Sequence, residues 1–422
     1  MKFSVYNLGC KVNSYECESV AKALEEKGFT RVSFEEEADI AIIFTCAVTN
    51  MASQKSRKML HRIKREYPRE AVCMVGCYSQ LNDGKIDDAD IIVGTAHKKD
   101  IPSYVETYFQ DRKPIRIIES LDNIQFENLT TNEFENKSRA YLKIQDGCNQ
   151  FCTYCVIPYL RGKERSMDID QVLLEAKSIA QNYPEIVLTG IHTGRYGYDK
   201  GYSLYDVIVR ILNETTIHRI RISSIEITEI NDALIELIAK EDRIAKHLHI
   251  PLQAGADETL KRMQRPYSTN AYYDIIQKIR NRIPDISISC DLIVGFPMES
   301  DELFQASYDF VKKCEFSFLH VFPFSSRNGT KAAEMKQQVD AQTKKARVRA
   351  CTNLSKELLD SYQKEWIGKK VEVIAERNDG EFTYGYSSNY MLIKTEGVIE
   401  NKEYFIAEIV GYDNHQLVAK RL

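Results

Sequence analysis

Short apolar runs alternate with amphipathic stretches along most of this chain, and the alternation comes in two series. The apolar runs of the first series lie at Phe3–Leu8, Ile40–Phe44, Val72–Val75 and Ile91–Val93. Helical patterns lie between and after them at Ser14–Lys27, Ser53–Arg65 and Tyr104–Phe109. Strands that alternate with helices form a parallel sheet with helices on both faces. We therefore expect residues 1–112 to fold as a small α/β domain.

A second series begins at Arg139, after a polar connector at residues 113–138. Its strand candidates are Ala140–Ile144, Ile186–Leu188, Ile220–Ile222, Leu248–Leu252, Ser287–Val294 and Phe316–Phe322. Its helical stretches are Ile169–Gln181, Leu204–Leu212, Asp232–Ala239, Tyr272–Ile283, Glu302–Lys312 and residues 340–364. Five or six strand–helix units form a partial barrel, with sites at the C-terminal ends of its strands. Residues 139–364 are thus expected to form a partial (βα)6 barrel.

The last part of the chain, residues 365–422, has a different pattern. Short strand candidates lie at Val371–Ala375, Tyr390–Ile393, Tyr404–Ala407 and Leu417–Ala419, around Gly and Asn turns. This pattern predicts a small all-β barrel. The fold class is therefore α/β, followed by a C-terminal all-β barrel.

Composition narrows the possible functions. The 422 residues are 43% hydrophobic and 28% charged, as in ordinary globular proteins, and the net charge of −4 gives no overall nucleic-acid signature. No apolar run is long enough to cross a bilayer, and the N-terminus reads as a strand rather than a signal peptide. Eleven cysteines in such a chain favour metal ligation in a reducing compartment. We expect a cytoplasmic protein that does not engage membranes.

Cys148, Cys152 and Cys155 form a C-x3-C-x2-C motif. Three thiolates at this spacing can hold three corners of a 4Fe–4S cube, whose fourth iron then lacks a local ligand. An open metal position can bind a substrate or a cofactor. The alternative is a structural zinc site, but zinc spacings favour paired C-x2-C units and this motif has no such partner.

A second group of cysteines comes from the ends of strand patterns. Cys10, Cys46 and Cys77 each end one of the first three strand patterns of the chain. The C-terminal ends of parallel strands meet at one crevice of an open sheet, so these cysteines should lie together and hold a second cube. Taken singly, each could be a buried small residue. The same interpretation, packing or incidental surface, is favoured for Cys17, Cys73, Cys290, Cys314 and Cys351.

Two three-cysteine groups followed by a terminal β-barrel resemble the radical S-adenosylmethionine (SAM) methylthiotransferases, and the match covers nearly the whole chain. Tyr154, just before Cys155, fits the superfamily signature. The resemblance implies a flavodoxin-like N-terminal domain (1–112), a connector (113–138), a radical SAM partial barrel (139–364) and a TRAM-like β-barrel (365–422). It also implies two 4Fe–4S clusters, with SAM bound at the open iron of the central one.

Segments at the ends of the barrel strands match the family as well, and in the family they line the SAM pocket. The residues implied to bind SAM are Tyr154, Gly190, Ser224, Glu226, Gln253 and Gly295. For Glu226 and Gln253 the alternative is a polar residue satisfied inside the barrel. For Gly190 and Gly295 the alternative is a simple turn.

Three segments resemble the branch of the family that modifies N6-threonylcarbamoyladenosine in tRNA: Gly9–Glu16, Thr45–Thr49 and Cys155–Gly162. The implied reaction is insertion of a methylthio group at C2 of this adenine, at tRNA position 37. SAM would be both the methyl donor and the source of the 5′-deoxyadenosyl radical, with sulfur delivered at the auxiliary cluster. The implied partners are a tRNA anticodon stem-loop, an external electron donor and a sulfur source.

Two alternatives stay open. The substrate could be isopentenyladenosine in tRNA or an aspartate of a ribosomal protein, because those enzymes share the domain plan. A protein of another class, an RNA-binding scaffold with structural iron–sulfur clusters, is the second alternative. Structural sites are normally fully ligated, and this argues against the scaffold.

Basic residues lie next to both cysteine groups and could form a phosphate track. The candidates for RNA contacts are Lys55, Arg57, Lys58, Arg161, Lys163 and Arg165, with Tyr386 and Asn389 in the C-terminal barrel. The alternatives are a solvated helix face for the basic residues and barrel core for the aromatic ones. Arg161, Lys163 and Arg165 are also the nearest candidates for a cation that pairs with the threonyl carboxylate.

Overall fold

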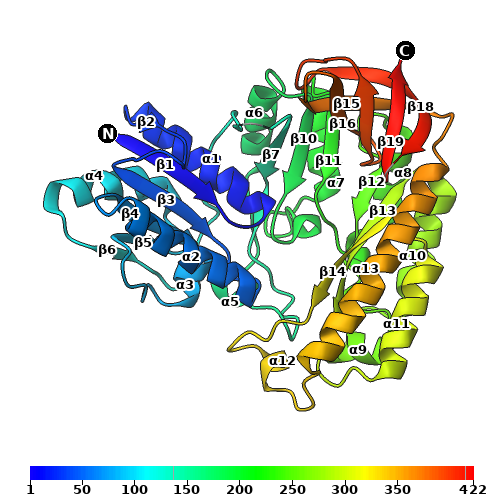
Figure 1. Ribbon diagram of the computed structural model, residues 1–422, viewed down its shortest axis with the longest axis horizontal. Helices are drawn as coiled ribbons and strands as arrows, with labels where there is room; N and C mark the ends of the chain where they lie inside the picture. The colour runs from blue at the N-terminus through cyan, green and yellow to red at the C-terminus, as the bar shows by residue number, and fades with distance from the viewer. Residues whose placement is uncertain (136, 414) are drawn as a thin grey trace.

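The computed structural model describes residues 1–135, 137–413 and 415–422, which fold into three parts (Figure 1). The N-terminal part is a parallel sheet with strand order β2-β1-β3-β4-β5-β6. Its strands are β1 (Lys2–Asn7), β2 (Thr30–Arg31), β3 (Ile40–Thr45), β4 (Ala71–Gly76), β5 (Ile91–Val93) and β6 (Ile115–Ile117). Its helices are α1 (Lys11–Glu26), α2 (Asn50–Glu66), α3 (Cys77–Leu81) and α4 (Ile101–Asp111), with a 3-10 turn η1 (Lys98–Asp100) before α4.

Helices cover both faces of this sheet. In β3, Ile40 and Ile42 face a core that includes Leu24 of α1, and Ile43 faces a second core that includes Leu60 of α2. A strand buried on both faces needs apolar residues at successive positions, which explains the continuous apolar run of β3. The predicted alternation of strands and helices is therefore present.

The sheet continues beyond the predicted domain boundary at residue 112. The edge strand β6 pairs in parallel with β5 through Ile91 and Ile115. Residues 113–117, the first five of the predicted connector, thus belong to the N-terminal part. The connector itself begins after Ile117. Sequence periodicity missed β6 because a three-residue strand is too short to show it.

The middle part contains the six predicted parallel strands. They are β7 (Arg139–Lys143), β10 (Glu185–Thr189), β11 (Arg219–Ile222), β12 (His247–His249), β13 (Ser287–Val294) and β14 (Phe318–Pro323). They form two groups in the orders β11-β10-β7 and β12-β13-β14. The groups meet where Ile220 of β11 bridges to Ile244 and where the Ile225 amide donates to the His249 carbonyl at 3.0 Å. The result is an open, six-stranded barrel.

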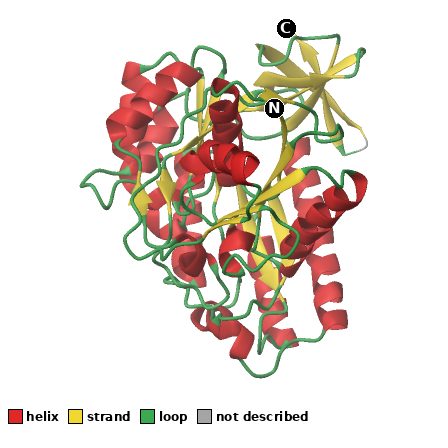
Figure 2. Ribbon diagram, turned by 90° about the vertical axis from the view of Figure 1, so that its left-hand side faces the viewer, coloured by secondary structure: helices red, strands yellow, loops and turns green. Residues whose placement is uncertain are grey.

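Helices pack on the outside of this barrel, as Figure 2 shows in red. The longer ones are α6 (Ile169–Ile179), α7 (Leu204–Glu214), α8 (Asp232–Lys240), α10 (Thr269–Arg282), α11 (Asp301–Cys314) and α13 (Ala341–Lys364). Short elements complete it: β8 (Gln145–Asp146), α5 (Ile157–Arg161), β9 (Arg165–Ser166), η2 (Thr193–Arg195), η3 (Ile227–Glu229), α9 (Asp257–Arg262) and α12 (Lys331–Glu334). Ser355 of α13 accepts a hydrogen bond from the Leu319 amide at 2.9 Å, which fixes α13 along β14.

The C-terminal part is a closed five-stranded barrel in the order β15-β16-β17-β19-β18. Its strands are β15 (Lys370–Asn378), β16 (Phe382–Ser387), β17 (Leu392–Glu396), β18 (Tyr404–Asp413) and β19 (Gln416–Arg421). Strand β16 was not expected, and the strand expected to start at Tyr390 starts at Leu392, because Tyr390 lies in the turn with φ 65°. The predicted all-β barrel is otherwise present.

Two arginines of β11 anchor this barrel to the middle part. Arg219 donates to the Tyr386 carbonyl at 3.3 Å, and Arg221 donates to the carbonyls of Ser387 and Ser388 at 3.3 and 3.0 Å. The turn after β16 is thereby held against the open barrel. None of the helices in the described part of the chain has the length and apolar character needed to span a bilayer.

Candidate active site

The first cysteine group lies at the carboxyl ends of three neighbouring strands. Cys10 follows β1 and caps α1, Cys46 follows β3, and Cys77 follows β4 and begins α3. A Cβ atom on Gly9 would lie 3.2 Å from the Cβ of Cys46, so the glycine permits this close approach. Burial raises the pKa of Cys46 to about 11, and the nearby Cys77 and Cys10 add to the shift. The structure therefore brings together three residues that are far apart in sequence.

The second group, Cys148, Cys152 and Cys155, lies in the loop between β8 and α5. The Cys155 amide donates to the Cys152 carbonyl at 2.9 Å, and the Cys148 amide donates to the Gly162 carbonyl at 3.1 Å. These bonds fold the loop back on itself. Burial raises the pKa of Cys155 to about 12, with further contributions from Cys152 and Cys148. The three thiols of this loop thus also lie near one another.

Each cysteine group has an arginine against one of its sulfur atoms. Arg265 donates to the Sγ of Cys152 at 3.4 Å. At the other group, burial raises the pKa of Cys77, while the charge and hydrogen bond of Arg161 act in the opposite direction. A thiol must lose its proton to ligate a metal, and a neighbouring guanidinium favours the thiolate.

His192 also contacts a cysteine, because its Nδ1 lies 3.5 Å from the Sγ of Cys148. Burial alone would lower the pKa of His192, but hydrogen bonds to Cys148, Glu164 and Glu229 raise it. The sequence alone does not single out Arg265 or His192. No local motif marks either residue as a neighbour of the cysteines, since Arg265 lies 113 positions from Cys152 and His192 lies 44 from Cys148.

Thiolates are the usual protein ligands of iron–sulfur clusters. Within residues 1–135, 137–413 and 415–422, no group of three His, Cys, Asp or Glu side chains is arranged to hold one metal ion. A cube spreads its ligands over several irons, so its thiolates stand farther apart than the ligands of one ion. Three thiols and a nearby arginine at each site fit such a cluster.

A cavity of about 230 Å³ is shared by the two parts that carry the cysteine groups. Val48 and Thr49, which follow Cys46, line it from the N-terminal part, and Tyr154, Cys155 and Gln253 line it from the barrel. The Thr49 hydroxyl also accepts a hydrogen bond from the Ala52 amide at 3.1 Å and so caps α2. This mainly apolar cavity is thus lined by Cys155 of the central group and, from the N-terminal part, by the two residues Val48 and Thr49 that come shortly after Cys46.

A second cavity, of about 290 Å³, shares Asp291 with the first. It reaches the interior of the open barrel and the turn of the C-terminal barrel. Lys11, Arg139, Arg221, Ser224 and Tyr390 are among the residues that line it. It is the more polar and cationic of the two cavities.

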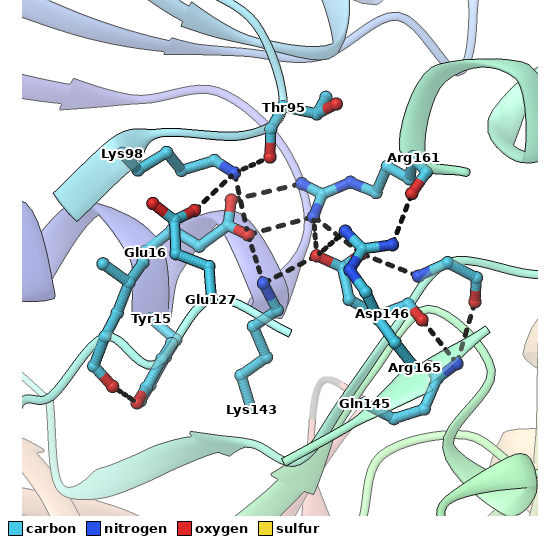
Figure 3. Close-up of polar contacts among 12 residues, drawn as sticks. Tyr15, Glu16, Thr95, Lys98, Glu127, Lys143, Gln145, Asp146, Arg161 and Arg165 are labelled. Carbon is cyan, nitrogen blue, oxygen red and sulfur yellow. Dashed lines mark hydrogen bonds and ion pairs between the residues drawn. The ribbon is translucent and has the colours of Figure 1, made fainter. Parts of the chain in front are cut away.

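A buried network of charges joins the N-terminal part to the barrel beside the cysteine groups (Figure 3). Glu16 of α1 accepts from Lys143 at 2.7 Å and from Arg161 at 3.0 and 3.2 Å. Asp146 pairs with the same two cations and with Arg165, the last at 3.1 Å. Burial alone would raise the pKa of Glu16, but Arg161 and Lys143 hold it below its ordinary value.

Three predictions of RNA contact are corrected by the burial of the residues concerned. Arg161 and Arg165 are 1% and 7% exposed and pair with buried carboxylates, so neither can reach RNA. Asn389 is 3% exposed, donates to the Tyr362 hydroxyl at 2.9 Å and accepts from Ser387 at 2.6 Å. Sequence alone shows the charge of a side chain but not its distant partners. The exposed candidates are Lys55, Arg57, Lys58 and Lys163, while Tyr386 is half-buried.

The residues predicted to bind SAM divide into three sets. Tyr154 and Gln253 line the first cavity, and Ser224 lines the second. Glu226 lies beside the central cysteines, where it pairs with Arg265. For Gly190 and Gly295 the SAM contact stays a prediction, and a Cβ atom there would lie 2.9 Å from Gln145 Oε1 and 2.4 Å from Lys344 Cγ. These two glycines make room for side chains of the protein itself.

Comparison with known proteins identifies the family of this chain. Residues 142–311 match the radical SAM superfamily, and residues 2–94 match the uncharacterized protein family UPF0004. Over 404 residues, 93% of this chain and 90% of the relative, the chain is 40% identical to threonylcarbamoyladenosine tRNA methylthiotransferase MtaB of Bacillus subtilis. The chain belongs to the radical SAM methylthiotransferase family. It is therefore an enzyme of the transferase class, and membership implies SAM and a 4Fe–4S cluster as cofactors.

Two further relatives show the breadth of the methylthiotransferase family. MtaB of Aquifex aeolicus is 36% identical over 405 residues, which covers 95% of this chain and 98% of the relative. The tRNA-2-methylthio-N(6)-dimethylallyladenosine synthase of Natranaerobius thermophilus is 33% identical over 411 residues, 94% of this chain and 91% of the relative. Enzymes named for two different substrates thus resemble this methylthiotransferase over nearly its full length.

Solved structures show the same fold at low sequence identity. The radical SAM methyltransferase TsrM of Kitasatospora setae, with cobalamin and a [4Fe-4S] cluster bound, matches with a TM-score of 0.57 at 13% identity. The match covers 79% of this chain and 74% of TsrM. The cobalamin-dependent radical SAM enzyme OxsB matches with a TM-score of 0.52 at 11% identity, over 82% of this chain and 56% of OxsB. The radical SAM fold of this methylthiotransferase is therefore shown.

Proposed function

We propose that this enzyme inserts a methylthio group at C2 of N6-threonylcarbamoyladenosine at position 37 of tRNA. The observation that carries the proposal is that Cys155 and the segment after Cys46, Val48 and Thr49, line one cavity, in a chain that is 40% identical to an enzyme named for this substrate. The strand order of the N-terminal sheet supports a flavodoxin-like domain, and the closed C-terminal barrel suits a TRAM-like role. We assign the N-terminal domain to residues 1–112 together with strand β6, the radical SAM barrel to residues 139–364, and the C-terminal barrel to residues 365–422.

Cys148, Cys152 and Cys155 would hold the radical SAM cluster, and Cys10, Cys46 and Cys77 would hold an auxiliary 4Fe–4S cluster. When bound, these groups supply a 5′-deoxyadenosyl radical from SAM at the first site and sulfur at the second. An external electron donor and a sulfur source are needed, and a cytoplasmic location suits a tRNA substrate.

The residues of the chain position and shield the reactants. Tyr154 and Gln253 would flank SAM in the first cavity, with Ser224 and Glu226 nearby. The apolar lining of that cavity would keep water away from a radical. The C2–H bond of an adenine has no acidic hydrogen that a side chain could remove, so the chain supplies orientation and exclusion rather than acid–base chemistry.

The anticodon stem-loop would approach along exposed cations. Lys55, Arg57 and Lys58 lie on α2, whose start follows Thr49 at the first cavity, and Lys163 lies beyond the central cysteine loop. Phosphate contacts from such residues position RNA without reading its sequence. Tyr386 could assist from the C-terminal barrel, although the Arg139 guanidinium covers its ring at 4.9 Å.

The second candidate substrate is isopentenyladenosine in tRNA, because a relative named for the dimethylallyl form is 33% identical. Its side chain is apolar, whereas the threonylcarbamoyl group carries a carboxylate. A carboxylate needs a cation in a buried site. The cationic lining of the second cavity favours the threonylcarbamoyl substrate.

Two triple variants test the roles of the cysteine groups. The Cys10/Cys46/Cys77→Ala variant should still cleave SAM to 5′-deoxyadenosine but should transfer no methylthio group. The Cys148/Cys152/Cys155→Ala variant should do neither. The matched control is Cys17→Ala, a buried cysteine of α1 outside both groups, which should do both. Methylthio transfer by the N-terminal triple variant would refute its role as sulfur carrier.

A further inference from the structure

The second cavity contains one positively charged side chain that no carboxylate matches. Lys11 is the first residue of α1, directly after Cys10, and its exposed side chain lines the cavity. Across residues 1–135, 137–413 and 415–422, its ammonium group makes no hydrogen bond or ion pair. A cation that stands at a cavity wall without a partner is available to an anionic group of a ligand.

The two arginines of the same cavity differ from Lys11, because protein carboxylates already pair with them. Arg139 lies 2.7 Å from Glu376. Arg221 donates to both oxygens of the fully buried Glu185, at 2.7 and 3.1 Å. Lys11 therefore provides the free positive charge of this cavity.

The acidic and imidazole groups of the cavity are also engaged. Asp291 lies 3.3 Å from Nε2 of His249, whose Nδ1 lies 2.9 Å from the Ser289 hydroxyl. His247 lies 3.0 Å from the same hydroxyl. Asp291 thus pairs with His249 on the barrel strands and not with Lys11.

Aromatic rings form another wall of the cavity. The ring of Tyr390 stacks on that of His247 at 4.8 Å, and the ring of Phe318 lies 6.2 Å from Tyr390. Both Tyr390 and Phe318 line the cavity. Aromatic side chains beside a cation suit a splayed-out base that carries an acidic substituent.

We propose that Lys11 binds the carboxylate of the threonylcarbamoyl group and so selects this substrate, an inference that rests on the proposed function. The cation and Cys10 are adjacent residues, and the cavity of Lys11 shares the lining residue Asp291 with the cavity of Cys155. A nucleotide held by Lys11 would therefore be tethered next to both cysteine groups. Arg161 and Arg165, the cations favoured from sequence, are buried and paired and cannot take this role.

The test compares Lys11→Gln and Lys11→Arg with a matched control, Lys356→Gln, which removes an exposed lysine from α13. The probes are anticodon stem-loops that carry threonylcarbamoyladenosine, its neutral methyl ester, or isopentenyladenosine. Fluorescence anisotropy gives the Kd of each stem-loop, and product formation gives KM and kcat. Iron content and thermal unfolding establish that each variant is folded and loaded.

The wild-type protein should bind the threonylcarbamoyl stem-loop at least tenfold more tightly than its methyl ester. In Lys11→Gln, Kd and KM should rise about tenfold for the threonylcarbamoyl stem-loop and stay unchanged for the methyl ester. Lys11→Arg and Lys356→Gln should keep the wild-type preference for the carboxylate form. An unchanged Kd for Lys11→Gln, or an equal loss for the ester, would overturn the role of Lys11. Failure of the wild type to modify the threonylcarbamoyl stem-loop would instead refute the proposed function.

Discussion

Arg161 of helix α5 donates one hydrogen bond to each carboxylate oxygen of Glu16 of helix α1, at 3.0 and 3.2 Å. The pair crosses from the barrel to the N-terminal part, and the same guanidinium faces Cys77. Bidentate pairs of this kind fix orientation as well as distance. The position of one cysteine group relative to the other is therefore set partly by this pair.

Replacement of Glu16 should destabilise the protein strongly. Glu16 is fully buried, and Glu16→Ala would leave Arg161 and Lys143 with Asp146 as their one remaining shared carboxylate among the described residues. Breaking a buried ion pair from one side costs about 3–5 kcal/mol. Urea denaturation should show a loss of this size, whereas Glu26→Ala, at an exposed position of the same helix, should change stability little. Equal stability of the two variants would contradict the structural role of the pair.

Glu175 should make stability depend on pH. Its carboxylate lies 2.7 Å from the Tyr15 hydroxyl, which also contacts the Leu129 carbonyl oxygen. A hydroxyl has one proton to donate, so a protonated Glu175 that donates to Tyr15 satisfies all three groups. Burial raises the pKa of Glu175 to about 7.

The sign of the pH effect follows from proton release. The folded protein keeps the Glu175 proton up to about pH 7, but the unfolded chain releases it near the ordinary value of 4.5. Unfolding between these pH values releases a proton, so rising pH lowers the free energy of unfolding. Glu175→Gln cannot ionise and should be more stable than wild type at pH 8 by about 1–3 kcal/mol, but similar at pH 5. Parallel pH profiles from urea denaturation would show that Glu175 is not the cause.

Gly147 should be essential for the central cysteine loop. Its φ is 73°, and a Cβ atom there would lie 2.0 Å from the Lys163 carbonyl oxygen. Gly201 has a φ of 82°, and a Cβ atom there would meet no other atom within 4 Å. Gly201→Ala should therefore lower the free energy of unfolding only by the cost of holding an alanine in the left-handed backbone conformation, about 1 kcal/mol. Gly147→Ala should lower the melting temperature more and reduce iron at the central site. Equal effects of the two variants would mean that the close contact is unimportant.

Iron content should report two clusters. Anaerobically reconstituted protein should contain about eight irons per chain, as two cubes. Each triple Ala variant, at Cys10/Cys46/Cys77 or at Cys148/Cys152/Cys155, should retain about four. Colorimetric iron assay with Mössbauer spectroscopy measures both number and type. An unchanged iron content in the N-terminal triple variant would exclude the auxiliary cluster.

The sequence predicts the convergence of Cys10, Cys46 and Cys77 because a simple topological rule applies to them. Each follows an apolar strand, and the carboxyl ends of parallel strands meet at one edge of a sheet. The order β1-β3-β4 then makes the three ends neighbours. The proximity of Cys148, Cys152 and Cys155 can be predicted without knowing the sheet topology, since the three cysteines lie within one loop.

Other features depend on partners that no local pattern reveals. The burial of Arg161 depends on Glu16, 145 positions away, so a basic run in the sequence resembled an RNA surface. The role of Gly190 depends on Gln145, and that of Asn389 on Tyr362. Lys11 lies in a segment that resembles the threonylcarbamoyladenosine branch, but the sequence does not show that its ammonium group lacks a partner among the described residues, which only packing can establish.

The most direct test of the account is mass spectrometry of an anticodon stem-loop that carries threonylcarbamoyladenosine. The stem-loop is incubated with reconstituted protein, SAM and a reductant, then digested to nucleosides. We predict that the threonylcarbamoyladenosine gains one methylthio group in place of the C2 hydrogen, whereas an isopentenyladenosine stem-loop stays unmodified. Product from the isopentenyl stem-loop alone, or from neither stem-loop alongside a modified ribosomal protein, would contradict the account.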